Sequence, residues 1–179
     1  MYPLVSSRLR QDPDPVMAAF VKKTGIPVTT TVMGLGAFPS NDPLSLRMLG
    51  MHGAVYANIA LNHADLVIAM GVRFDDRVTG KLAEFCKNAQ FIQIDIDPTE
   101  INKNIAIDVP IQGDVKQTLK VLDKYVEPKK DIEPWVKQIN GWKKEFPLAF
   151  ENKKGQIVPQ SVVHDINKIS EKDAIFSVG

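Results

Sequence analysis

Residues 64–80 read ADLVIAMGVRFDDRVTG. Within this stretch Leu66–Met70 is a nearly continuous apolar run, which is typical of a parallel strand covered on both faces. Gly71 follows at the strand's end, where it permits close approach of a ligand to the backbone. Arg73 and Arg77 each carry a guanidinium group that can fork onto phosphate or carbonyl oxygens. The stretch therefore predicts a buried strand with a nucleotide-type site at its carboxyl end.

The rest of the chain alternates between strand-like and helix-like patterns. Such alternation predicts an α/β fold with a parallel, Rossmann-like, doubly wound sheet flanked by helices. Two of the predicted helices are amphipathic, and residues 53–63 carry small side chains that allow close packing on a sheet. We expect strands at 26–31, 66–70, 90–98 and 109–112 and helices at 16–23, 53–63, 115–126 and 134–150, and the pattern allows a short helix around 44–49.

Composition sets limits on the partners of this chain. The 22 Lys and Arg residues nearly balance the 21 Asp and Glu residues, so the net charge of +1 gives no argument for a nucleic-acid or anionic-membrane partner. No apolar run approaches the roughly 18 residues that span a bilayer. The single cysteine, Cys86, excludes an intrachain disulfide and a cysteine-based zinc site. We expect a soluble protein from a reducing compartment.

Each candidate site also has a plain structural interpretation. The Arg-x-x-Asp-Arg loop at 73–77, with Asp75 and Asp76 between the arginines, equally fits a surface network of ion pairs. The run TVMGLG at 31–36 lacks the third glycine of the dinucleotide fingerprint, so by itself it indicates a turn. A lone histidine such as His52 is more often a packed or capping group than a catalyst, since no other histidine has ligand-type spacing to it.

Two further acidic positions follow predicted strands. Asp95, with Ile96, comes where the third strand, within residues 90–98, runs into a loop, and there a carboxylate can accept hydrogen bonds from ribose hydroxyls. Gly113 and Asp114 come after the fourth strand, at a helix N-terminus that can receive a ligand. Asp114 is equally suited to be a plain N-cap, and the two roles are compatible.

The runs MLGMHG at 48–53 and GVRFDDRVTG at 71–80 together resemble the central domain of the acetolactate synthase (acetohydroxyacid synthase) catalytic subunit, a thiamine diphosphate enzyme. The resemblance covers about residues 24–179, the middle third of a full-length subunit. It implies a doubly wound central domain that binds FAD. Val72 departs mildly from the alanine that many relatives have. The resemblance implies FAD contacts for Thr31, Val32, Met33, Leu49, Gly50, Met51, His52, Gly71, Val72, Arg73, Asp75, Arg77, Asp95, Ile96, Gly113 and Asp114, and an active-site entrance at Met51, Asp76 and Arg77.

The resemblance also implies an activity for the full-length enzyme. That enzyme condenses pyruvate with a second 2-ketoacid to acetolactate or acetohydroxybutyrate, in branched-chain amino-acid biosynthesis. Its thiamine diphosphate and Mg²⁺ sites belong to other domains, and the Gly-Asp-Gly motif of the magnesium site does not occur here. We therefore expect no catalytic or metal-binding residue in this chain, and no synthase activity from it alone.

The family further implies a homodimer or homotetramer with a possible regulatory small subunit, and a cytoplasmic location, or a plastid or mitochondrion in a eukaryote. Residues 1–15 are expected to be an irregular lead-in, lacking the glycine-rich loop that usually touches the flavin diphosphate. By the same resemblance, residues 16–150 are expected to form the central FAD-binding domain. Residues 151–179 are expected to be a linker and a truncated start of the C-terminal thiamine diphosphate-binding domain, with a helix at 157–168 and a strand at 174–178.

Two alternatives stay open at this point. The chain fits the central nucleotide-binding domain of another thiamine diphosphate enzyme, of the pyruvate oxidase, glyoxylate carboligase or oxalyl-CoA decarboxylase type. It also fits a non-catalytic nucleotide-binding module. The bound ligand separates them: FAD favours the synthase, ADP or CoA the decarboxylase type, and no ligand the non-catalytic module.

Overall fold

The computed structural model of this protein describes residues 2–5, 14–128, 131–151 and 154–170. The chain divides into two compact units. The first, Met1–Phe146, contains the sheet and most of the helices. The second, Pro147–Gly179, contains one described helix.

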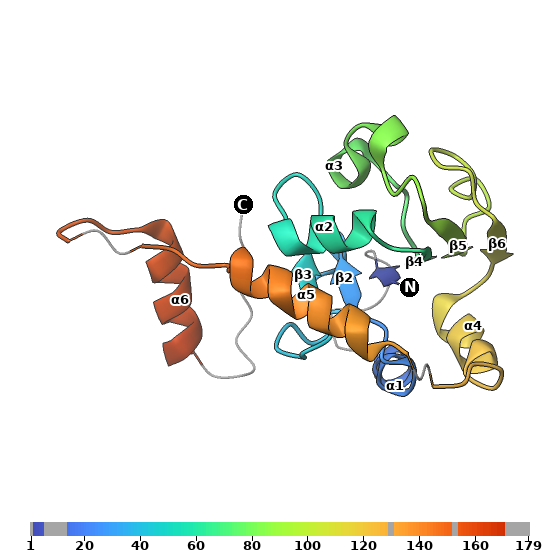
Figure 1. The fold of residues 1–179 in the computed structure, drawn as a ribbon, viewed down its shortest axis with the longest axis horizontal. Helices are drawn as coiled ribbons and strands as arrows, with labels where there is room; N and C mark the ends of the chain where they lie inside the picture. Colours follow the sequence, from blue (N-terminus) through green and yellow to red (C-terminus); the bar gives the residue numbers. More distant parts are fainter. Residues whose placement is uncertain (1, 6–13, 129–130, 152–153, 171–179) are drawn as a thin grey trace. The chain divides into compact units, whose positions relative to one another are not determined.

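The first unit is built on a six-stranded parallel sheet with the strand order β3-β2-β1-β4-β5-β6 (Figure 1). This is the doubly wound order, which confirms the predicted fold class. In such sheets ligands bind outside the carboxyl ends of the strands, near the point where the strand order reverses, here between β1 and β4. The strands are β1 (Tyr2–Val5), β2 (Val28–Thr30), β3 (Ser45–Met48), β4 (Leu66–Met70), β5 (Gln90–Asp95) and β6 (Val109–Gln112).

Helices cover both faces of this sheet, as Figure 1 shows. Alternate residues of a strand point to opposite faces, and β4 follows this rule. Val67 and Ala69 join a core cluster with helices α2 (Val55–Asn62) and α5 (Glu133–Glu145). Ile68 and Met70 join a second cluster with α1 (Pro15–Thr24) and α4 (Val115–Leu122). The strand is therefore buried on both faces, as its apolar run predicts.

Helix α1 is held at its first turn by Asp14. The Asp14 carboxylate accepts hydrogen bonds from the backbone N–H groups of Val16 (2.8 Å) and Met17 (3.4 Å), and it pairs with Lys116 of α4 at 3.2 Å. Burial alone would raise the pKa of Asp14, but these hydrogen bonds and the Lys116 charge outweigh it and lower the pKa. One carboxylate thus caps one helix and ties it to its neighbour.

The structure corrects two sequence expectations. Residues 45–48 form an edge strand rather than a helix, because Ser45 and Leu46 are buried and the backbone pairs with β2. Residues 2–5 form β1, between β2 and β4, where an irregular lead-in was expected. A four-residue apolar run is too short to signal a strand by periodicity, and only its neighbours select it. Residues 6–13 and the strand expected at 174–178 lie outside the described residues.

Several predicted helices are shorter in the structure. The helix expected at 115–126 ends at Leu122, and the one expected at 134–150 ends at Glu145, before a proline that disfavours helical backbone in the residue preceding it. A short helix α3 (Asp76–Thr79) follows β4, and two 3₁₀ turns occur at η1 (Val32–Gly34) and η2 (Leu82–Glu84).

In the second unit, helix α6 (Pro159–Ile169) lies close to the expected 157–168. Pro159 occupies its first turn, where the missing N–H costs nothing. The ring of Phe150 meets that of His164 edge-on at 5.9 Å. The assignment of 151–179 to the start of another domain stays a prediction. None of the helices in the described part of the chain has the length and apolar character that crossing a membrane requires.

Candidate functional site

A pocket of about 390 Å³ opens at the carboxyl ends of β2, β3 and β4. Three segments that are far apart in the sequence form its walls: the turn after β2, the loop after β3 and the loop after β4. Most of the residues for which the sequence predicts FAD contact meet here. The walls contain Thr31, Val32, Met33, Met48, Leu49, Met51, His52, Val72, Arg73, Phe74, Asp75, Arg77 and Val78.

The first wall is the turn after β2. Thr31 is buried and caps η1, because its hydroxyl accepts a hydrogen bond from the Gly34 N–H at 3.2 Å. Val32 and Met33 are 64% and 66% exposed, so they present apolar surface at the mouth of the pocket. The plain interpretation of this run as a turn is therefore correct for Thr31 and Gly34, while Val32 and Met33 stay available to a ligand.

The second wall is the MLGMHG loop after β3, and Gly50 explains its sequence. Gly50 has φ +94°, and a Cβ there would lie 2.4 Å from the carbonyl oxygen of Arg77. The next residue, Met51, donates its N–H to that same oxygen at 3.0 Å. The Asn58 side chain accepts from the Gly50 N–H (2.8 Å) and donates to the Gly50 carbonyl (3.0 Å). The two family-like runs therefore touch and form one substructure.

The third wall is the loop after β4. Gly71 has φ +64°, a conformation that turns the chain at the end of β4, while its N–H still donates to the Ile94 carbonyl of β5 at 2.8 Å. Phe74 also has positive φ, +50°, an uncommon conformation for a residue with a side chain. Its buried ring meets those of Phe85 and Phe91 at centroid distances of 6.2 and 5.8 Å. This packing anchors the loop while Arg73 stays exposed.

The pocket has a distinct set of charges. Arg73 and Arg77 both line it, and Arg77 forms an exposed ion pair with Asp76 at 3.1 Å. An exposed ion pair of this kind contributes under about 1 kcal/mol of stability, so Arg77 can leave Asp76 and bind a ligand at little cost in free energy. The Oδ1 atom of Asp75 is buried and has no hydrogen-bond partner among the described residues. A buried carboxylate oxygen without a donor is costly, and a ligand hydroxyl would satisfy it.

The remaining predicted residues lie outside this pocket. Gly71 is at the end of β4, and Gly50 lines a neighbouring pocket of about 330 Å³ together with the predicted entrance residues Met51, Asp76 and Arg77. The entrance role of that second pocket stays a prediction.

The residues after β5 and β6 lie on the same edge of the sheet but bond to one another. The Asp95 carboxylate accepts from the Asp97 N–H at 3.0 Å, and the Asp95 carbonyl accepts from the Gly113 N–H at 2.9 Å. Asp114 caps α4 by accepting from the Gln117 N–H at 2.9 Å, as its plain interpretation predicts. Ile96 is exposed.

Sequence reasoning missed several residues that build the pocket. Met48, Phe74 and Val78 line it, while Asn58, Gln93 and Asn104 hold its loops in place. Gln93 carries a readable signal, because a polar amide on a buried strand must find partners. Asn58 and Asn104 carry none, since they lie in segments that are partly exposed and otherwise unremarkable.

Among the residues that the structure describes, neither a metal centre nor a reactive thiol lies at the pocket. In the part of the chain that the structure describes, no three His, Cys, Asp or Glu side chains gather closely enough to hold a metal ion. Burial raises the pKa of Cys86 to about 12, so its thiol stays protonated and unreactive near neutral pH. His52 is exposed at the pocket wall.

Comparison with known proteins identifies the family to which this chain belongs. The family described as "Thiamine pyrophosphate enzyme, central domain" matches residues 10–122, so the chain belongs to the thiamine pyrophosphate enzymes through that domain.

Acetolactate synthases are among its curated relatives. The chain is 49% identical over 165 residues to acetolactate synthase 1, chloroplastic, of Zea mays, covering 89% of this chain and 26% of the relative. It is 46% identical over 168 residues to acetolactate synthase, chloroplastic, of Arabidopsis thaliana, covering 91% and 25%. It is 47% identical over 162 residues to the acetolactate synthase large subunit of Cyanidium caldarium, covering 87% and 27%. The chain thus spans about a quarter of the length of the relatives it matches.

Proposed function

We propose that this chain is the FAD-binding central domain of an acetolactate synthase, which condenses pyruvate with a second 2-ketoacid. The observation that carries the proposal is the contact between the MLGMHG and GVRFDDRVTG loops at the Arg77 carbonyl, because both loops line the pocket. The high identity to acetolactate synthases supports the same function.

The residues of the pocket suit a flavin dinucleotide. Val32, Met33 and Met51 supply exposed apolar surface for a planar ring. Arg73 supplies a cation that can bind phosphate oxygens, because a guanidinium matches their geometry. The unpartnered Oδ1 atom of Asp75 can accept a hydrogen bond from a ribityl hydroxyl. Val72 lines the pocket but is only 1% exposed, so it offers a ligand little contact area.

The adenosine half of FAD is proposed to lie along the ends of β5 and β6, at Asp95, Ile96, Gly113 and Asp114. This places the dinucleotide across the switch point of the sheet, where doubly wound folds bind such ligands. The acetolactate reaction transfers no net electrons, so these residues bind and orient the FAD and do not transfer protons or hydride to it.

The chemistry of condensation belongs to other parts of the whole protein. Thiamine diphosphate, held with Mg²⁺ outside these residues, supplies the electron sink for decarboxylating pyruvate. Within this chain Met51, Asp76 and Arg77 are proposed to border the entrance for the 2-ketoacid. The whole protein is further proposed to be a homodimer or homotetramer, with a possible regulatory small subunit, in the cytoplasm or in a plastid or mitochondrion.

A domain exchange tests this function. The matching 165-residue region of the maize acetolactate synthase is replaced by this chain, and the purified chimera is assayed for bound FAD and for acetolactate formed from pyruvate. We expect both FAD and activity, and we expect the chimera with Arg73→Ala to lose FAD. A folded chimera that holds ADP or CoA in place of FAD would assign the chain to another thiamine enzyme.

The isolated chain makes a complementary test. It lacks the Gly-Asp-Gly motif of the magnesium site, so we expect it to form no acetolactate from pyruvate, even with thiamine diphosphate, Mg²⁺ and FAD present. Detectable acetolactate from the chain alone would overturn this part of the proposal.

A further inference from the structure

A network of side-chain amides lies behind the loop that carries Arg73. Gln93, on β5, is only 1% exposed, and its Nε2 atom donates to the Val72 carbonyl at 2.9 Å and to the Glu100 carbonyl at 3.1 Å. It therefore ties the start of the β4–α3 loop to the segment that follows β5.

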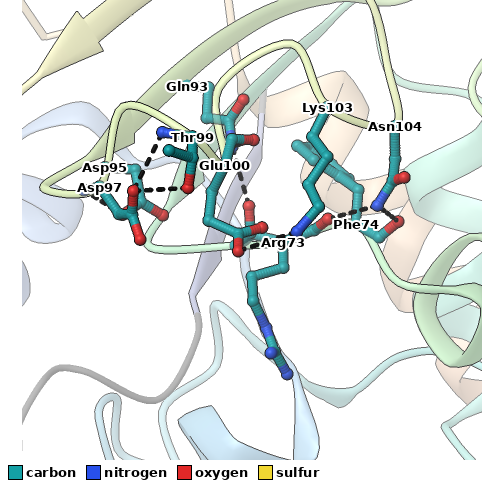
Figure 2. Close-up of polar contacts among 10 residues, drawn as sticks. Arg73, Phe74, Gln93, Asp95, Asp97, Thr99, Glu100, Lys103 and Asn104 are labelled. Carbon is teal, nitrogen blue, oxygen red and sulfur yellow. Dashed lines mark hydrogen bonds and ion pairs between the residues drawn. The ribbon is translucent and has the colours of Figure 1, made fainter.

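Asn104 holds the next two peptides of the same loop. Its Nδ2 atom donates to the Arg73 carbonyl at 3.0 Å and to the Phe74 carbonyl at 3.1 Å. Figure 2 shows the Asn104 amide facing these carbonyls, while the Arg73 side chain points away from the network. Three consecutive carbonyls, those of residues 72, 73 and 74, are thus each bound by a side-chain amide.

The backbone of this loop needs such support. Gly71 and Phe74 both have positive φ, and for Phe74, which has a Cβ, this conformation is disfavoured unless the surroundings over-determine it. The Phe74 ring is fixed by Phe85 and Phe91. Ring packing alone leaves the peptide planes on either side free to rotate, and the Asn104 amide fixes both of them.

The segment that delivers Asn104 is itself well formed. Asp97 accepts from the N–H and hydroxyl of Thr99 at 3.0 and 2.7 Å, and Lys103 pairs with Glu100 at 3.1 Å. Neither Gln93 nor Asn104 lines the pocket, whereas Arg73 and Asp75 both do. The amides therefore act on the pocket only through the backbone they hold.

We propose that Asn104, supported by Gln93, is a positioning residue of the cofactor site: it fixes the peptides around Phe74 so that Arg73 and Asp75 face the ligand. The proposal rests on the proposed FAD site for its ligand. Its structural half, a loop locked by Asn104, holds in the ligand-free protein and is tested there.

The experiment uses Asn104→Asp, which keeps the shape of the side chain but replaces the donating amide by a carboxylate that faces two carbonyl oxygens. The first readout is the rate of tryptic cleavage after Arg73 in the ligand-free protein, measured by mass spectrometry. Cleavage of a folded loop tracks the population of its open form. We expect this rate to rise about tenfold, because two hydrogen bonds are lost, while cleavage after Lys124 is unchanged.

The second readout is FAD affinity by calorimetry, which we expect to weaken about tenfold in Asn104→Asp. Gln93→Glu is also isosteric, and we expect it to raise the cleavage rate after Arg73 and to weaken FAD binding as well. The matched control is Thr99→Ala, which removes an exposed side-chain hydrogen bond to Asp97 in the same segment but leaves the amide in place, and both readouts should stay at the wild-type value.

The proposal would be overturned if Asn104→Asp were cleaved after Arg73 at the wild-type rate. It would also be overturned if the rate rose equally at all cleavage sites, because that result indicates general destabilisation. If the wild-type chain binds no FAD, the proposed function fails, but the cleavage pattern still decides whether Asn104 locks the loop.

Discussion

The carboxyl edge of the sheet has two halves that use similar residues in different ways. On the β3-β2-β4 side, backbone atoms of separate loops approach so closely that Gly50 has no room for a side chain. Other side chains of these loops line a pocket. On the β5-β6 side, Asp95 and Asp114 are occupied by turns and a helix cap, and Gly113 has ordinary space around it. The first half is built around a cavity, whereas the carboxylates of the second half already accept hydrogen bonds from nearby backbone N–H groups.

This difference teaches which sequence signals report on a site. Glycine and acidic residues follow strands in both halves, and the sequence alone does not separate them. The separating feature is the contact between loops, since Gly50 and Met51 meet the Arg77 carbonyl across 26 residues of chain. The predictions below test the contrast, from the largest effect to the smallest.

The largest contrast is expected between two glycine-to-alanine substitutions. Gly50→Ala forces a Cβ to within 2.4 Å of the Arg77 oxygen at φ +94°, and we expect it to lower the free energy of unfolding by about 3 kcal/mol. Gly113→Ala meets only Thr118 Oγ1 at 3.4 Å, and we expect a change under about 0.5 kcal/mol. Urea unfolding measures both, and equal losses would erase the distinction between the halves.

The support of Gly50 by Asn58 comes next. Asn58→Ala removes one donor and one acceptor from the Gly50 peptide, and we expect a loss of about 2 kcal/mol in unfolding free energy. Asn58→Asp keeps the acceptor and should fall between the wild type and Asn58→Ala. If Asn58→Ala unfolds at the same urea concentration as the wild type, the MLGMHG loop does not depend on this side chain.

On the other half, Asp114 is expected to matter mainly as a helix cap. Asp114→Ala should cost about 1 kcal/mol of stability, because one helical N–H loses its acceptor, and Asp114→Asn should restore most of it. The same variants should weaken FAD binding less than Arg73→Ala does. A larger effect on FAD affinity than on stability would show that Asp114 contributes more to the proposed adenosine site than to the helix cap.

The Asp14 carboxylate, which caps α1 and pairs with Lys116, predicts a small, pH-dependent effect on the free energy of unfolding. The pKa of Asp14 is lowered in the folded protein, so its contribution is fully present above the unfolded pKa of about 3.8 and is lost as the pH falls through the lowered value. Asp14→Ala should therefore unfold more easily than the wild type at pH 7, by about 1 kcal/mol, and the difference should shrink as the pH falls below the unfolded pKa of 3.8. A difference that does not change between pH 7 and pH 2 would contradict the charged cap.

Much of this architecture could be predicted from the sequence. The apolar run Leu66–Met70 and the strand Val109–Gln112 are found where the pattern places them, because both are bounded by clear polar or glycine signals. Residues 45–48 and 2–5 could not be predicted as strands, because each depends on pairing with neighbours far away in the sequence.

The composition of the pocket was predictable to a similar extent. The loops with glycines and arginines are visible in the sequence, and most of their residues line one pocket. The residues that hold those loops are not visible. Asn104 acts on peptides thirty residues earlier in the chain, and only the folded structure brings an exposed asparagine to two carbonyls of the same loop.

The most direct test of the central claim is a calorimetric titration of FAD onto the purified chain, with flavin fluorescence as a second signal. The wild type should bind FAD, and Arg73→Ala should bind at least about tenfold more weakly because a charge-assisted hydrogen bond is lost. Lys81→Ala, which removes an exposed cation outside the pocket, should bind like the wild type. Equal affinity of the wild type and Arg73→Ala, or no binding at all, would contradict a flavin site in this pocket.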